Sequence, residues 1–308
     1  MIYFEANNDT LDKCITHFCA PLFASGQFVR GGHSESTTNA TVTFIEWRHR
    51  VYAVTCHHVL ATFFEQSIAT GIRRIPSIHS DRSVHQFGSF LPTGEYVWTF
   101  RSCRKFPDPT DIGNTDALTK LAQRNLEFPD IAIADMTEHW PVLAKSRNAN
   151  VLKLDSWTEP NWATTHPTWM AFGFPDTHKT RQGDKIAVPM PRVVVEVSLP
   201  PSAERPEFTL MSTLENHHGW RFSGLSGGPV VVADRTRDLC AFVGIVFEGS
   251  PGSENPHEHA GTVFGGSDIM LRGYHVTPYT FAKWLKGLRY GVQFPPDDVP
   301  PILSGEAV

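Results

Sequence analysis

Short runs of β-forming residues, separated by glycine, proline, asparagine and aspartate, dominate the chain from about Gly26 onward. Brief runs of this kind are typical of strands. TVTFIEW (41–47) and VYAVT (51–55), with Arg-His-Arg between them, predict a β-hairpin. We expect further strands in 130–136, 170–175, 187–200, 208–214, 229–234, 241–249 and 270–277. Many short strands and few helices predict a mostly β protein, a sandwich or barrel, and two barrels suit 308 residues.

Helical spacing of apolar residues is confined to a few places. It predicts helices within 9–19 and 114–127, and VLATFFEQ predicts a brief helix over 59–66. The best-marked helix start is Thr277 as N-cap followed by Pro278 at the first helical position. The polar stretch 140–165 is expected to be a connection, and the proline-rich tail from Gly291 to be extended or disordered.

Composition narrows the classes of function. The net charge is −5 without a long block of like charges, which argues against a nucleic-acid partner. The chain has no run of 18 or more apolar residues, and its first residues lack the pattern of a secretory signal. Five scattered cysteines fit reduced thiols better than a disulfide framework. We therefore expect a soluble, cytoplasmic protein with no membrane partner.

The stretch RFSGLSGGPVVVADR (221–235) places Ser226 between glycines, directly before a run of β-formers. Such a cluster is most often a simple turn. A serine nucleophile would need an adjacent base, an orienting group for that base and donors for the developing oxyanion. The glycines permit a sharp bend that would let the amides of Gly224 and Ser226 converge on one point and lift the hydroxyl clear of the strand.

A base and an acid are available elsewhere. AVTCHHVL (53–60) ends a β-run in two histidines, and FPDIAIA (128–134) presents Asp130 at the start of an apolar strand. Each feature alone is weak, because paired histidines are usually solvent-facing and an acid at a strand start is usually a turn residue.

Together, Thr-x-x-His-Val, Asp-Ile-Ala and Gly-x-Ser-Gly-Gly-Pro, in that order, resemble the three signature blocks of the chymotrypsin-like serine peptidases. The separations are 72 residues from His58 to Asp130 and 96 from Asp130 to Ser226. The resemblance covers about 26–290 and implies two antiparallel six-stranded β-barrels with a short N-terminal helix and a C-terminal helix. It implies a helical extension over 1–25, a first barrel over 26–145, a second barrel with a closing helix over 146–290, and a tail over 291–308.

The resemblance also implies a mechanism and a site. Ser226 would be the nucleophile, His58 the base, Asp130 its orienting acid, and the amides of Gly224 and Ser226 the oxyanion hole. Thr55, three positions before His58, favours His58 over His57. GIVFEG (244–249) is similar to the family's substrate-holding strand, which makes Phe247, Glu248 and Gly249 predicted substrate-binding residues. Trp220, six positions before Ser226, is the fourth, because the base of the family's primary pocket usually lies there. The expected substrate is a protein or peptide, and no cofactor or metal is needed.

The chain departs from this family in two ways. Leu225 stands where secreted relatives have an acid that pairs with a new amino terminus. The resemblance therefore implies that this activation switch is absent. A regulatory protein partner is one other way in which the protease activity could be restrained. Trp220 stands where the base of the primary pocket usually lies. A bulky base favours small substrate residues, whereas Glu248, Glu254 and Glu258 could attract basic ones.

Three other functions stay open from the sequence. Gly224–Gly228 also satisfies G-x-S-x-G, which would make the chain an α/β-hydrolase-type esterase with Asp268 and His275 as partners. A trypsin fold kept as a catalytically silent or partner-locked binding module is the second. The third is a metal site, built from His217, His218, His257 and His259 or, less favoured, from the Cys14/Cys19 pair.

Overall fold

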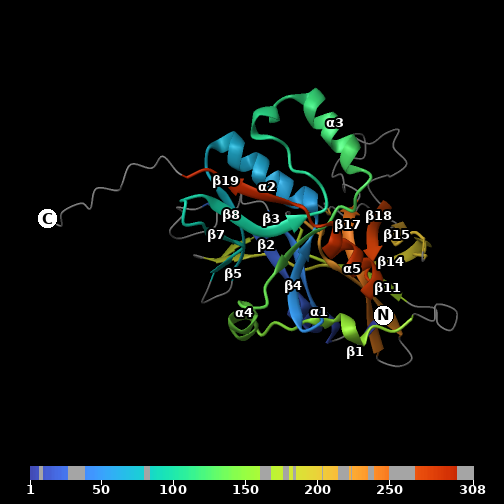
Figure 1. Ribbon diagram of the computed structural model, residues 1–308. Coiled ribbons are helices and arrows are strands. Elements are labelled where there is room, and N and C mark those ends of the chain that lie inside the picture. Colours follow the sequence, from blue (N-terminus) through green and yellow to red (C-terminus); the bar gives the residue numbers. More distant parts are fainter. Residues whose placement is uncertain are drawn as a thin grey trace.

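The computed structural model describes residues 1–6, 10–26, 39–79, 84–159, 168–175, 180–182, 185–202, 204–213, 222, 224–234, 239–249 and 268–296. Strands dominate, in two large sheets that lie side by side in Figure 1, with α3 standing out at the top of the view. The predicted mostly β architecture of two antiparallel barrels is confirmed.

The second barrel is closed. Its six strands are β11 (Thr168–Phe172), β14 (Arg192–Leu199), β15 (Glu207–Thr213), β16 (Pro229–Asp234), β17 (Leu239–Gly249) and β18 (Asp268–His275). They pair in the order β17-β16-β11-β14-β15-β18, and β18 returns to pair with β17. All of these pairings are antiparallel, so the strand after Ser226 lies inside a closed antiparallel ring.

The first barrel is nearly closed. It contains β2 (Cys19–Gly26), β3 (Asn39–Trp47), β4 (Arg50–Thr55), β5 (Arg74–His79), β6 (Val84–Gln86), β7 (Gly88–Phe90), β8 (Tyr96–Ser102) and β9 (Ala132–Asp135). The order is β8-β9-β4-β3-β2-β5-β6, and β7 pairs with β8. Phe87 connects the two ends, because its N–H donates to Pro76 O of β5 and its carbonyl accepts from Thr99 N of β8.

Strands from elsewhere in the chain complete both sheets. β1 (Ile2–Glu5) pairs with β17 of the second barrel, whereas β19 (Tyr290–Phe294) pairs with β8 of the first. β10 (Leu152–Lys153) runs parallel to β3. Residues 2–5 and 290–294 therefore lie in the sheets, at positions assigned from the sequence to a helical extension and, in large part, to a tail. The sequence did not predict β1, β10 or β19, which have four, two and five residues and therefore little hydrophobic pattern.

The helices lie between strands or at the ends of the barrels. They are α1 (Leu11–Phe18), α2 (His57–Thr70), α3 (Thr115–Asn125), α4 (Trp140–Arg147) and α5 (Pro278–Gly287). Short 3-10 turns occur at Pro109–Asp111 and Leu154–Ser156. Two further strands, β12 (Thr180–Gln182) and β13 (Lys185–Ala187), form a separate hairpin. α5 begins as predicted, with a Thr277 capping box. α4 was missed because Leu143 is its only buried residue, which leaves no apolar stripe. No described helix is long and apolar enough to cross a membrane.

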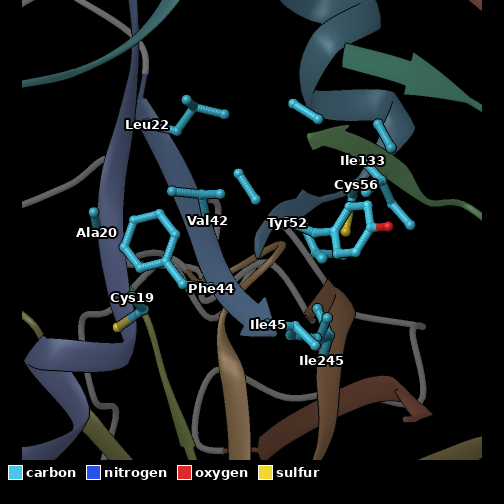
Figure 2. Close-up of a cluster of buried hydrophobic side chains, with 14 of the residues drawn as sticks. Cys19, Ala20, Leu22, Val42, Phe44, Ile45, Tyr52, Cys56, Ile133 and Ile245 are labelled. Atoms are coloured by element: carbon cyan, nitrogen blue, oxygen red, sulfur yellow. The ribbon is translucent and has the colours of Figure 1, made fainter. Parts of the chain in front are cut away.

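The strand β3 connects the core to the site. Val42 and Phe44 point into the first barrel's core and are fully buried, and Figure 2 shows them among residues of β2, β4 and β9. The opposite face of β3 carries Thr41 and Thr43, which are also fully buried. Buried hydroxyls require hydrogen-bond partners. Those partners lie in the second barrel.

Candidate active site

Ser226 lies in a tight turn that only glycine permits at two positions. Gly224 and Gly227 have φ of +97° and +90°, which side-chain-bearing residues rarely adopt. A Cβ on Gly227 would stand 2.0 Å from Thr41 O. The turn is closed by hydrogen bonds from Leu225 N to Phe222 O, at 3.1 Å, and from Gly228 N to Leu225 O, at 2.7 Å. The glycines around the serine are therefore needed for the close contact with β3.

The first barrel holds this turn by its carbonyl groups. The Thr41 hydroxyl donates to Gly224 O at 2.7 Å, and the Thr41 amide donates to Ser226 O at 3.1 Å. The Thr43 hydroxyl donates to Gly227 O at 2.7 Å. Since all three carbonyl oxygens are bound to β3, the orientation of the peptide groups around Ser226 is fixed.

The amides of the turn divide into two sets. The N–H groups of Leu225, Gly227 and Gly228 donate to backbone carbonyls. Those of Gly224 and Ser226 donate to no acceptor in the described part of the chain. These are the two amides that the sequence predicts as an oxyanion hole. Free, preorganised donors beside a hydroxyl are what stabilisation of a tetrahedral oxyanion requires.

His58 and Asp130 form a two-point contact. α2 begins at His57, directly after β4 ends at Thr55, so His58 lies in the first turn of the helix. Its backbone N–H donates to Asp130 Oδ1 at 3.0 Å, and its Nδ1 lies 2.8 Å from Asp130 Oδ2. Asp130 thus binds the helix start, where a carboxylate is stabilised. The Nδ1 contact leaves Nε2 of His58 for a second partner.

The Asp130 carboxylate is buried but charged. Burial alone would raise its pKa, but the hydrogen bonds and charge of His58, with the charge of Arg104, lower the pKa below its ordinary value. Arg104 Nη1 lies 3.5 Å from Asp130 Oδ2. From the second barrel, Tyr274 Oη accepts a hydrogen bond of 3.0 Å from Asp130 N. Sequence reasoning missed Arg104 and Tyr274, whose local sequence gives no sign of this contact.

One cavity of about 630 Å³ is lined by seven of the eight predicted site residues. Its lining includes His58, Asp130, Gly224, Ser226, Phe247, Glu248 and Gly249, along with Arg104, Leu126, Glu207, Arg272 and Tyr274. No hydrogen bond joins His58 to Ser226 in the described structure. Trp220, the eighth predicted site residue, lies outside the described residues, as do Glu254 and Glu258.

The end of β17 forms one side of the cavity. β17 pairs with β16 only as far as Ile245, whereas its other side pairs with β18 as far as Gly249. Phe247 stacks on Tyr274 at 4.3 Å between ring centroids. The Glu248 carboxylate is paired with Arg272 at 2.8 Å, and Arg272 also contacts Glu207 at 3.2 Å. Glu248 therefore already has a cationic partner within the chain.

The neighbouring His57 occupies a different environment. It is buried, its Nδ1 lies 2.8 Å from Ser102 Oγ, and its ring packs on Phe106. Burial lowers its pKa to about 4. It does not belong to the cavity lining, whereas His58 does. These contacts are those of a packing residue.

The other candidate sites fare differently. Ser226 is followed by the antiparallel strand β16 rather than by a helix, so the esterase alternative is wrong. His275, the base that the esterase alternative requires, lines a separate cavity with Trp157. The four histidines of the metal hypothesis lie outside the described residues. Within the described ones, Cys14 and Cys19 are free thiols, and no cluster of three or more metal-binding side chains occurs.

No protein-family model matches the sequence, and no curated protein matches it. Among solved structures, the chain is similar to the thermostable serine protease AL20 from an extremophilic microorganism, with 10% identity and a TM-score of 0.39 over 89% of this chain and 97% of that one. It is also similar to the protease Anisep from Arthrobacter nicotinovorans, with 11% identity and a TM-score of 0.35 over 88% and 95%. Likeness at this level assigns no residue a role.

Proposed function

We propose that this protein is a serine endopeptidase that works through an acyl-enzyme. Ser226 Oγ attacks the scissile carbonyl carbon while His58 Nε2 takes its proton. The resulting imidazolium is stabilised by Asp130, and the amides of Gly224 and Ser226 bind the oxyanion. The protonated His58 then gives its proton to the leaving amine. Water, deprotonated by the same imidazole, releases the acyl group and restores Ser226.

One observation carries this proposal. The carbonyls of the serine turn are bound to β3, while the two amides beside the hydroxyl donate to nothing in the described chain. Backbone N–H groups that donate to nothing in the described chain are free to bind an acceptor on a substrate. The same cavity contains a histidine already oriented by a buried carboxylate. Acyl transfer uses all of these groups.

A peptide is the substrate that the cavity suits. On the side of β17 that faces away from β18, residues 247–249 have no strand partner in the described sheet. An extended peptide can add to such an edge through main-chain hydrogen bonds. It would lie along Phe247 and Gly249, which share the cavity lining with Ser226.

A fluorophosphonate probe tests the proposal directly, because it reacts with an activated serine. Wild-type protein should be labelled at Ser226 and should cleave an unstructured protein substrate. Ser226→Ala and His58→Ala should lose both activities, by about 10⁴-fold or more in rate. His57→Gln should still be labelled at pH 8. Labelling that survives in Ser226→Ala, or near-normal turnover in His58→Ala, would contradict the assignment.

The alternative is a catalytically silent or partner-locked binding module. The lack of a hydrogen bond between His58 and Ser226 in the described structure favours it, although such bonds often tighten only when substrate binds. A folded wild type that the probe never labels, with or without a peptide substrate, would favour this alternative.

A further inference from the structure

A cation stands beside the acid of the candidate site. Arg104 lies two residues beyond β8 and Asp130 two residues before β9, and these strands pair at Ser102 and Ala132. The two side chains therefore start from adjacent strand ends. Arg104 Nη1 lies 3.5 Å from Asp130 Oδ2, the same oxygen that contacts His58 Nδ1 at 2.8 Å. One carboxylate oxygen thus serves both a guanidinium and an imidazole.

The chain fixes Arg104 independently of Asp130. Its backbone N–H donates to Ser102 Oγ at 3.0 Å, and its Nε donates to Phe128 O at 2.9 Å. The next residue, Lys105, exchanges two backbone-to-side-chain hydrogen bonds with Asn125 at the end of α3. The Arg104 side chain is only 17% exposed. Its charge is therefore held in place and only partly screened by water.

Three buried titratable groups near His58, namely His57, Cys56 and Tyr274, are neutral around neutral pH. His57 has a pKa of about 4 because it is buried, and burial raises the pKa of Cys56 and of Tyr274. Glu207 and Glu248 line the same cavity but pair with Arg272. In the described structure, Asp130 and Arg104 are thus the charged groups joined directly to the His58 contact.

Asp130 would stabilise the imidazolium that forms when His58 takes a proton. A guanidinium on the same oxygen offsets part of the carboxylate's charge and repels the imidazolium. We propose that Arg104 is a positioning residue that acts through Asp130 and makes His58 a weaker base, so that the site becomes active at lower pH. This inference rests on the proposed function in taking His58 as the base.

The test is a titration of His58 in the full-length protein, followed by NMR of ¹³C-labelled histidine and assigned with His58→Gln. Arg104→Gln removes the charge, so the midpoint of the His58 titration curve should move to higher pH than in the wild type. Arg104→Lys keeps the charge and should restore most of the wild-type value. Arg50→Gln is the matched control, because Arg50 pairs with Asp135 at the other end of β9 and does not line the cavity.

The pH dependence of fluorophosphonate labelling should follow the titration. Its acid limb should move to higher pH in Arg104→Gln and back in Arg104→Lys. If circular dichroism shows that Arg104→Gln does not fold, Arg104→Met is the second neutral variant, since it keeps an alkyl chain for packing. An unchanged or lowered His58 pKa in the neutral variant, or an Arg104→Lys that behaves like it, overturns the inference. Absence of labelling would count against the proposed function alone, because the titration needs no turnover.

Discussion

The amide of Thr41 in the first barrel donates a 3.1 Å hydrogen bond to the carbonyl of Ser226 in the second. The Thr41 hydroxyl makes two further bonds, donating to Gly224 O at 2.7 Å and accepting from Phe174 N at 2.8 Å. One buried threonine of β3 therefore holds the serine turn from the opposite barrel, and the geometry of the two amides that we propose as oxyanion donors depends on it.

Replacing Thr41 by valine keeps the shape but removes the hydroxyl. The Gly224 carbonyl and the Phe174 amide would each lose a buried partner, so unfolding free energy should fall by about 1–3 kcal/mol. Because the Gly224 peptide is no longer held, kcat should fall about tenfold with little change in KM. Urea unfolding and steady-state kinetics measure both effects. Thr70→Val, at an exposed hydroxyl that bonds Gln66 O, is the control and should change stability by less than about 0.5 kcal/mol. Equal effects in both variants would contradict the role of Thr41.

Gly227→Ala should prevent folding or cost more than about 4 kcal/mol, because the new Cβ meets Thr41 O at 2.0 Å and φ is +90°. Gly71→Ala is the matched comparison, since Gly71 also has positive φ, at +65°, but nothing lies within 4 Å of its Cβ. It should cost only about 1 kcal/mol. Thermal unfolding followed by circular dichroism separates the two. A mild Gly227→Ala would mean that the turn does not press against β3.

Tyr274→Phe should lower kcat about tenfold, because the Asp130 amide loses its acceptor in a buried position and the acid loses its tie to the second barrel. The ring, which stacks on Phe247, is preserved. Tyr96→Phe is the control, since Tyr96 Oη is buried without a hydrogen-bond partner in the described structure. That variant should keep wild-type kinetics and be at least as stable. Steady-state kinetics of the two purified variants measure the difference. Identical kcat values would contradict a role for Tyr274 in the site.

His57 should make the protein less stable in mild acid. Its pKa is about 4 when folded and 6.5 as an ordinary histidine, so between these values the unfolded chain binds the extra proton. The free energy of unfolding should therefore fall as pH drops from 6.5 to 4. In His57→Gln this fall should be smaller, because glutamine does not titrate. Urea denaturation of both proteins at pH 7.5 and pH 5 measures the difference, and parallel losses would count against a buried neutral His57.

The parts of the site that sequence could predict are those with local requirements. The glycines around Ser226 follow from the backbone turn, and His58 follows a strand that ends in Thr55. These residues do come together in one cavity. Arg104 and Tyr274 could not be predicted, because they reach Asp130 only through strand pairing and packing between barrels.

The threonines of β3 illustrate the same limit in the fold. Alternation of Thr41 and Thr43 with Val42 and Phe44 is typical of a strand with one face in solvent. Here the polar face is buried against the serine turn, and carbonyl groups of that turn accept hydrogen bonds from both threonine hydroxyls. The sequence predicted the strand, but not what covers its polar face.

The two barrels depend on each other, because β1 pairs with a strand of the second barrel and β19 pairs with a strand of the first. A split of the gene near residue 145 would leave β1 attached to a fragment that cannot use it, and would deprive the first barrel of β10 and β19. Each fragment would then expose unpaired strand edges, which favour aggregation. We therefore expect the two barrels to fold as one unit, and either half purified by itself to be insoluble.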